Sequence, residues 1–110
     1  MSAREDCRER LLSLLPETEE EAVSMAELAK LLSVTDRELR GMVESMRRDH
    51  VGISSSDAGY WYPIDADRRQ QDVERTASRL ESMAKAALLT ASRMREGLRK
   101  GACDGKEAEV

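Results

Sequence analysis

The residues best suited to a chemical role are four arginines in one short stretch: Arg37, Arg40, Arg47 and Arg48. At 100° per residue of a helix they fall, together with Glu44, within about 120° of arc. The opposite side of the same helix carries an apolar stripe: Leu39, Met42, Val43 and Met46. We therefore expect one face of this helix to pack into the core and the arginine face to be exposed. Arginines can neutralise phosphates and contact base edges, whereas Glu44 can accept a hydrogen bond from cytosine or pair with Arg40 or Arg48.

The residue types that serve most enzymes are sparse. His50 is the only histidine, and it has no second metal ligand at helical spacing. Cys7 and Cys103 stand far apart without a CxxC pattern, so we interpret Cys7 as a small buried hydrophobe. We expect no catalytic residue, no metal site, no cofactor and no enzymatic activity.

Length and charge limit the remaining possibilities. A chain of 110 residues can hold one compact domain and an extension. No membrane span or secretory signal is apparent, so we expect a cytoplasmic protein. Residues 1–64 contain 8 basic and 13 acidic side chains, against 10 and 9 in the rest. An acidic first half disfavours strong nonspecific attraction to nucleic acid, although Glu17, Glu19, Glu20 and Glu21 concentrate much of the acid in one loop.

Three serine or threonine residues are each followed three positions later by glutamate: Ser2 with Glu5, Ser24 with Glu27, and Thr35 with Glu38. Each pair predicts a capping box at a helix start. The first helix would bury Cys7, Leu11, Leu14 and Leu15 and end at Pro16, and the second would bury Leu28, Leu31 and Leu32. Only Ser33 and Val34 separate the second helix from the cap of the third, which predicts a helix-turn-helix.

A two-stranded hairpin is predicted after Gly52, from Ile53 across a turn over residues 54–59 to the Tyr60-Trp61-Tyr62 segment. Alternation would direct Trp61 to one face and its two tyrosine neighbours to the other. Ala22 and Val23 could add a third short strand. Trp61 could pack on a following helix or remain exposed as an anchor for a protein partner.

A long helix is predicted from Asp65 to about Lys100, with residues 101–110 as a disordered tail. Apolar residues repeat along it at alternating spacings of four and three, which indicates a coiled-coil seam. The seam consists of Val73, Ala77, Leu80, Ala84, Ala87, Ala91, Met94 and Leu98. Such a seam favours a homodimer, and the alternative is that the helix folds back on its own domain.

In this order of elements, residues 1–64 resemble winged helix-turn-helix domains of the biotin-repressor and DeoR-like type. The similarity is carried by LLSLL, by the block SMAELAKLLSVTDRELRGMVESMRRDHVGI and by GYWYP. Small stand-alone DNA-binding proteins of bacteria and phages are similar in architecture. The resemblance implies a mainly helical fold with a small hairpin, a third helix in the major groove and a wing beside it. The implied DNA-facing residues are Thr35, Arg37, Arg40, Glu44, Arg47, Arg48, Ser55 and Ser56.

Two functions follow as expectations. The first is a small transcriptional regulator that binds double-stranded DNA as a homodimer. The second is a protein-interaction module, such as an inhibitor of a DNA-handling machinery, which would dock through its acidic surface or Trp61.

Overall fold

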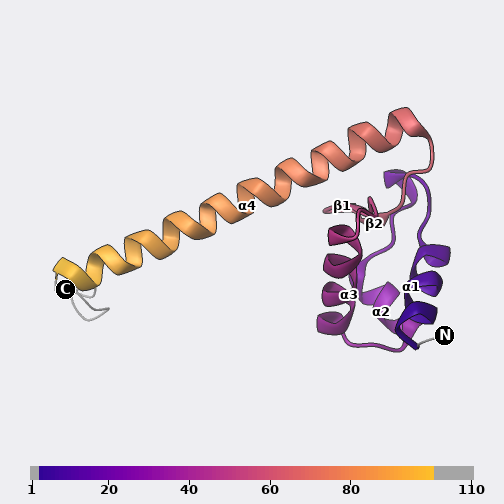
Figure 1. Ribbon diagram of the computed structural model, residues 1–110, viewed down its shortest axis with the longest axis horizontal. Coiled ribbons are helices and arrows are strands. Elements are labelled where there is room, and N and C mark those ends of the chain that lie inside the picture. Colours follow the sequence, from indigo (N-terminus) through magenta and orange to yellow (C-terminus); the bar gives the residue numbers. More distant parts are fainter. Residues whose placement is uncertain (1–2, 101–110) are drawn as a thin grey trace. The chain divides into compact units, whose positions relative to one another are not determined.

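The computed structural model describes residues 3–100 and is mainly helical, with one antiparallel hairpin (Figure 1). The elements follow the order α1 (Ala3–Leu14), the 3-10 helix η1 (Glu19–Glu21), α2 (Met25–Leu32), α3 (Asp36–Arg48), β1 (Ser54–Ser56), β2 (Gly59–Trp61) and α4 (Ala66–Lys100). The chain divides into two compact units after Thr76. The first unit contains the three short helices, the hairpin and the first turns of α4. The second described unit is the remainder of α4.

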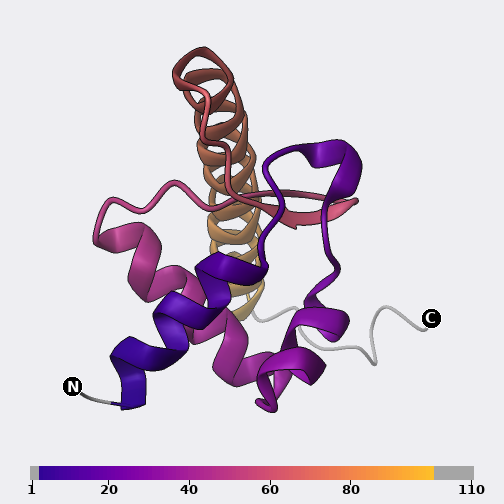
Figure 2. The same cartoon turned by 90° about the vertical axis from the view of Figure 1, so that its right-hand side faces the viewer.

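An aliphatic core holds the first unit together where α1, α2 and α3 meet (Figure 2). Its buried members are Leu11, Leu15, Leu28, Ala29, Leu32, Leu39, Val43, Met46 and Ile53. Most of these positions were predicted from helical spacing. Leu31 was predicted wrongly: it is 46% exposed, and Ala29 occupies the buried arc of α2 in its place. Cys7 is only half-buried.

Capping interactions begin α2 and α3 at the predicted residues. At α2 only one half of the predicted capping box forms: the Ser24 hydroxyl accepts a hydrogen bond from the Glu27 amide at 3.2 Å. Thr35 and Glu38 form a full capping box: the Thr35 hydroxyl accepts from the Glu38 amide, and the Glu38 carboxylate accepts from the Thr35 amide. The box fixes where α3 begins and hence which side chains its exposed face carries. The pair of Ser2 and Glu5 lies outside the residues whose side chains are described.

Both α2 and α3 end on a left-handed residue that is not glycine. Ser33 has φ 59° after α2, and His50 has φ 73° after α3. In each case the next amide bonds back into the last turn, from Val34 to the Ala29 carbonyl and from Val51 to the Met46 carbonyl. This is the Schellman arrangement, in which glycine is the usual left-handed residue. The arrangement at Ser33 makes the connection between α2 and α3 short.

The hairpin has a tighter turn than the sequence suggested. Ser54, Ser55 and Ser56 form strand β1, paired with Trp61, Tyr60 and Gly59, so the predicted turn shrinks to Asp57 and Ala58. The prediction missed this strand because serine has little intrinsic strand preference and the contacts that order it come from distant elements. Val23 adds the expected third strand as a single bridge to Tyr60.

Gly59 is required where Val23 and the hairpin meet. Its φ is 128°, and a Cβ there would lie 2.5 Å from the Val23 carbonyl oxygen. Only glycine permits both this backbone conformation and this close approach.

The first turns of α4 complete the first unit. Trp61 is fully buried, and its indole Nε1 donates a hydrogen bond to the Asp72 carboxylate at 2.8 Å. The expectation that Trp61 could be an exposed anchor is therefore wrong, and its packing on the following helix is confirmed. Val73 lies against Gly52, where a Cβ would come within 2.8 Å of the valine methyl. Val73 thus packs within the first unit, which continues to Thr76 and does not stop at Ile64.

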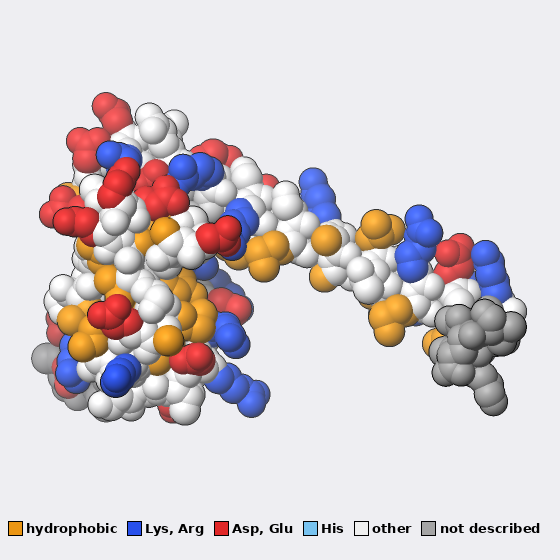
Figure 3. All heavy atoms as spheres, turned by 180° about the vertical axis from the view of Figure 1, so that it is seen from behind, with side chains coloured by type: hydrophobic (Ala, Val, Ile, Leu, Met, Phe, Trp, Pro, Cys, Tyr) orange, Lys and Arg blue, Asp and Glu red, His pale blue; other side chains and the backbone are white. Residues whose placement is uncertain are grey.

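The second unit, residues 77–100 as described, is a single helix with exposed apolar side chains. Figure 3 shows apolar groups along its surface. The large ones are Leu80, Met83, Leu88, Leu89, Met94 and Leu98. In the described part of the chain, no helix is both long enough and apolar enough to span a membrane. The predicted tail, residues 101–110, and Cys103 lie outside the described residues.

Candidate nucleic-acid interface

The exposed face of α3 carries three of the four predicted arginines with their charged ends in solvent. Arg37, Arg40 and Arg48 are exposed, whereas Leu39, Val43 and Met46 on the other side are buried. Arg37 and Arg40 form no side-chain hydrogen bond or ion pair with any of the groups that the structure describes, which exclude the side chains of residues 1–5 and 101–110. These two guanidinium groups are therefore available to an external acceptor. We call Arg37, Arg40, Gly41, Glu44 and Arg48 the α3 face.

The sequence left open whether Glu44 pairs with Arg40 or with Arg48, and in the structure it pairs with Arg48. Its carboxylate lies 3.0 Å from Arg48 Nη2, at a spacing of one helical turn. Both side chains are more than half exposed, so the pair adds little to folding stability. It orients Arg48 along the helix and leaves its other guanidinium nitrogens open to a ligand.

Gly41 lies in the middle of the α3 face. A Cβ at this position would meet nothing within 4 Å. Glycine inside a helix costs about 1 kcal/mol relative to alanine, and no neighbouring group in the described structure requires it here. The missing side chain exposes the helix backbone between Arg37 and Glu44, so a partner can approach closely at this point.

Arg47 does not belong to this exposed group. Its Nε donates to the Ile53 carbonyl at 2.8 Å and its Nη2 donates to the Ser55 hydroxyl at 3.0 Å. The guanidinium carbon lies 6.0 Å from the Tyr60 ring centroid, and burial lowers the pKa of Arg47. This arginine joins α3 to the hairpin. The sequence position of Arg47 indicated this internal role. Arg47 follows Met46 by one residue and Val43 by four, so it lies at the border of the buried stripe.

The two hairpin serines also make internal contacts. The Ser55 hydroxyl accepts from Arg47, and the Ser55 amide donates to the Thr76 hydroxyl at 3.1 Å. The Ser56 hydroxyl accepts from the Ala58 amide at 3.1 Å. Both serines are half-buried. They hold the hairpin in shape, as Thr35 holds the start of α3.

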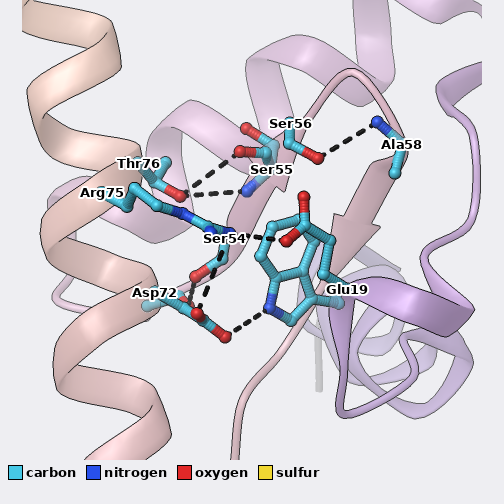
Figure 4. A network of polar contacts seen from close by, with 10 residues as sticks. Glu19, Ser54, Ser55, Ser56, Ala58, Asp72, Arg75 and Thr76 are labelled. Carbon is cyan, nitrogen blue, oxygen red and sulfur yellow. Dashed lines mark hydrogen bonds and ion pairs between the residues drawn. The ribbon is translucent and has the colours of Figure 1, made fainter.

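A polar network that the sequence did not predict connects the hairpin, η1 and the beginning of α4 (Figure 4). Arg75 Nη2 lies 2.7 Å from a Glu19 carboxylate oxygen and 4.0 Å from Asp72. Hydrogen bonds from Ser56, and then from Arg75, lower the pKa of Glu19. Thr76 and Asp72 are both buried. The sequence gave one indication that these two residues are buried. Asp72 and Thr76 are four residues apart, which places both polar groups on the same side of the helix as the apolar seam position Val73.

The α3 face and the surface formed by η1 and the hairpin turn carry charges of opposite sign. The α3 face presents guanidinium groups, whereas η1 presents the exposed carboxylates of Glu20 and Glu21 and the hairpin turn carries Asp57. No lysine or arginine occurs between Arg48 and Arg68 in the sequence. A polyanion would therefore meet attraction at α3 and none from side chains of the hairpin.

The described residues contain no group of three or more histidine, cysteine, aspartate or glutamate side chains that could hold a metal ion. No protein-family model matches the chain, and comparisons with curated proteins and with solved structures find no match either. The α3 face and the exposed helix of residues 77–100 are therefore the two surfaces from which we infer a function.

Proposed function

We propose that this protein binds double-stranded DNA through the α3 face and acts as a homodimer, as a small transcriptional regulator would. The observation that carries the proposal is the pair of unbonded, exposed guanidinium groups of Arg37 and Arg40 on a helix whose opposite side is buried. A helix of this kind fits the major groove, which is about 12 Å wide. Arginine on such a face reaches both phosphates and guanine edges.

The dimensions of the α3 face support the same assignment. From Arg37 to Arg48 the helix advances by about 16 Å at 1.5 Å per residue. Arg37, Arg40 and Arg48 lie along that length with Gly41 between them, where the backbone can approach the ligand. Thr35 serves as the helix cap, Arg47 and Ser55 join α3 to the hairpin, and Ser56 holds the hairpin turn. Their contribution to DNA binding would be through positioning.

Two copies would supply twice as many guanidinium groups as one. Phosphate neutralisation dominates affinity for DNA, and three exposed arginines on an acidic protein provide little of it. The exposed seam from Ala77 to Leu98 offers a surface through which a second copy could bind. The homodimer is thus part of the proposed function.

The test is fluorescence anisotropy with random-sequence duplex DNA at low and at moderate salt. We expect binding at low salt, a loss of affinity of about tenfold or more in Arg37→Ala/Arg40→Ala, and a salt slope reduced by about one per arginine that contacts phosphate. The control is Arg68→Ala/Arg69→Ala, which also removes two positive charges, from exposed positions in the same unit but outside the α3 face. Equal affinities of the control and Arg37→Ala/Arg40→Ala would overturn the proposal.

A protein-interaction module is the second candidate. The specific observation in its favour is the exposed acidic surface that includes Glu17, Glu20 and Glu21. Burial of Trp61 removes the aromatic anchor that the sequence had suggested for it. Absence of any duplex binding at low salt would favour this module over the DNA-binding protein. Selection of bound sequences from a random duplex library would then return no motif.

A further inference from the structure

We infer that residues 80–98 of α4 pair with the same helix of a second copy in antiparallel orientation. The inference deepens the proposed function and rests on the self-association included in it. It starts from the exposed apolar face of this helix, on which Leu88 is 71% and Leu98 is 78% exposed. Three independent features of side-chain size and charge select the orientation.

The first feature is the size of the seam residues. In an antiparallel pair with its two-fold axis near Leu89, Ala84 faces Met94 of the second copy and Ala87 faces Ala91. Each methionine then lies opposite a small residue, and the two helices can approach closely. A parallel pair stacks Ala84, Ala87 and Ala91 each on itself between bulky layers of Leu80 and Met94. That arrangement leaves voids in the centre, which packed interiors avoid.

The second feature is a pair of opposite charges on one edge of the seam. Glu81 and Arg95 are separated by two heptads, so they occupy equivalent positions beside the apolar stripe. Neither forms an ion pair within the part of the chain that is described. In the antiparallel alignment Glu81 of each copy lies opposite Arg95 of the other, which gives two ion pairs. In a parallel alignment Glu81 faces Thr76 and Arg95 faces Thr90.

The third feature is a large and a small residue on the other edge of the seam. Met83 and Gly97 are also two heptads apart, and the antiparallel alignment places each methionine over the glycine of the second copy. Met83 is 57% exposed, and a Cβ on Gly97 would meet nothing within 4 Å. The methionine would cover this open backbone. Leu88 lies beside the two-fold axis and packs against Leu88 of the second copy.

The orientation has a geometric consequence. At 1.5 Å per residue, the two Thr76 positions lie about 40 Å apart along an antiparallel pair and about 10 Å apart in a parallel one. The contact is isologous and closes on itself, so the product is a dimer and not a filament.

Cysteine cross-linking in a Cys7→Ser/Cys103→Ser background tests the orientation. Under mild oxidation, Leu88→Cys should form a disulfide dimer, because this residue lies near its own copy in the antiparallel pair. Ala84→Cys should remain largely uncross-linked, because the two copies of residue 84 are then about 15 Å apart along the axis. Cross-linking of Ala84→Cys without cross-linking of Leu88→Cys would establish the parallel pair and overturn the inference.

Charge exchange provides a second test with the full chain in sedimentation equilibrium. Glu81→Arg and Arg95→Glu should each raise the dimer dissociation constant by about five- to tenfold, because each places two like-charged pairs across the seam. The double variant should return to within about twofold of the natural chain. Lys85→Glu, on the outer side of the helix, is the matched control. A double variant as weak as the singles would contradict the antiparallel pairing.

Failure of the inference and failure of DNA binding are distinguishable. A monomeric natural chain at tens of micromolar would overturn self-association in either orientation, whereas the anisotropy of Arg37→Ala/Arg40→Ala would still report on the α3 face. A dimer with the parallel cross-linking pattern would overturn only the orientation.

Discussion

The indole Nε1 of Trp61 and the carboxylate of Asp72 form a buried hydrogen bond of 2.8 Å between β2 and α4. Trp61 is 0% exposed and Asp72 is 5% exposed. Buried polar groups must find partners, so this bond ties the hairpin to the first turns of α4. The Glu19–Arg75 pair and the Ser55–Thr76 hydrogen bond add two further links to the same turns.

Removal of the Asp72 carboxylate should destabilise the first unit. In Asp72→Ala the buried indole N–H loses its acceptor, which we expect to lower the free energy of unfolding by about 1–3 kcal/mol. Asp72→Asn keeps an acceptor oxygen and should lose less. Urea denaturation followed by the fluorescence of Trp61, the only tryptophan, measures both. Glu74→Ala, at an exposed position of the same helix, is the control, and an equal loss there would contradict the role of Asp72.

Glycine at the two left-handed helix ends should stabilise the protein. Ser33→Gly and His50→Gly would relieve an unfavourable backbone conformation worth about 1 kcal/mol each, less the greater freedom of glycine in the unfolded chain. We expect a net gain of roughly 0.5 kcal/mol for each variant. Lys30→Gly, inside α2, should lose about 1 kcal/mol. Thermal or urea unfolding that ranks all three variants below the natural chain would refute the role of the left-handed conformation.

Gly41→Ala should separate stability from binding. The added methyl meets no neighbour, so we expect the variant to gain about 0.5–1 kcal/mol in unfolding free energy. If a ligand approaches the backbone of the α3 face, the same methyl should weaken DNA binding measured by anisotropy. A more stable protein with lower affinity is the expected result. Unchanged affinity would mean that the ligand does not contact the helix at Gly41.

The decrease in the free energy of unfolding at acid pH should depend on Glu19 and Glu38. Hydrogen bonds from Ser56 and Arg75 lower the pKa of Glu19, and those from the Thr35 amide and hydroxyl lower the pKa of Glu38. A lowered pKa in the folded state gives stability above the ordinary glutamate value of about 4.3, which is lost as pH falls through the lowered pKa. Glu38→Gln should therefore be less stable at neutral pH and flatter below pH 4.3.

Urea midpoints measured from neutral pH down through this acid range will check that expectation. Glu19→Gln should behave in the same way, since Arg75 would lose its ionised partner. Glu74→Gln serves as the exposed control. A Glu38→Gln profile that runs parallel to that of the natural chain through the acid range would argue against the capping box as its origin.

Local signals in the sequence determined where most helices begin and which residues form the core. The Thr35 and Glu38 spacing alone places the start of α3, because a capping box needs only groups within four residues of each other. Leu39, Val43 and Met46 follow from helical periodicity for the same reason. The exposure of Arg37 and Arg40 is a direct consequence of both. These features depend on the chain within one or two helical turns.

Only the tertiary structure decided the roles of residues whose partners are distant in the chain. Arg47 became a hairpin contact because Ile53 and Ser55 lie beside it, and Trp61 became buried because Asp72 lies eleven residues further on. The same packing placed Val73 against Gly52 and extended the first unit to Thr76. Periodicity assigns a side chain to a face of its own element. It cannot say which other element will cover that face, because the covering contacts form only when segments far apart in the chain fold together.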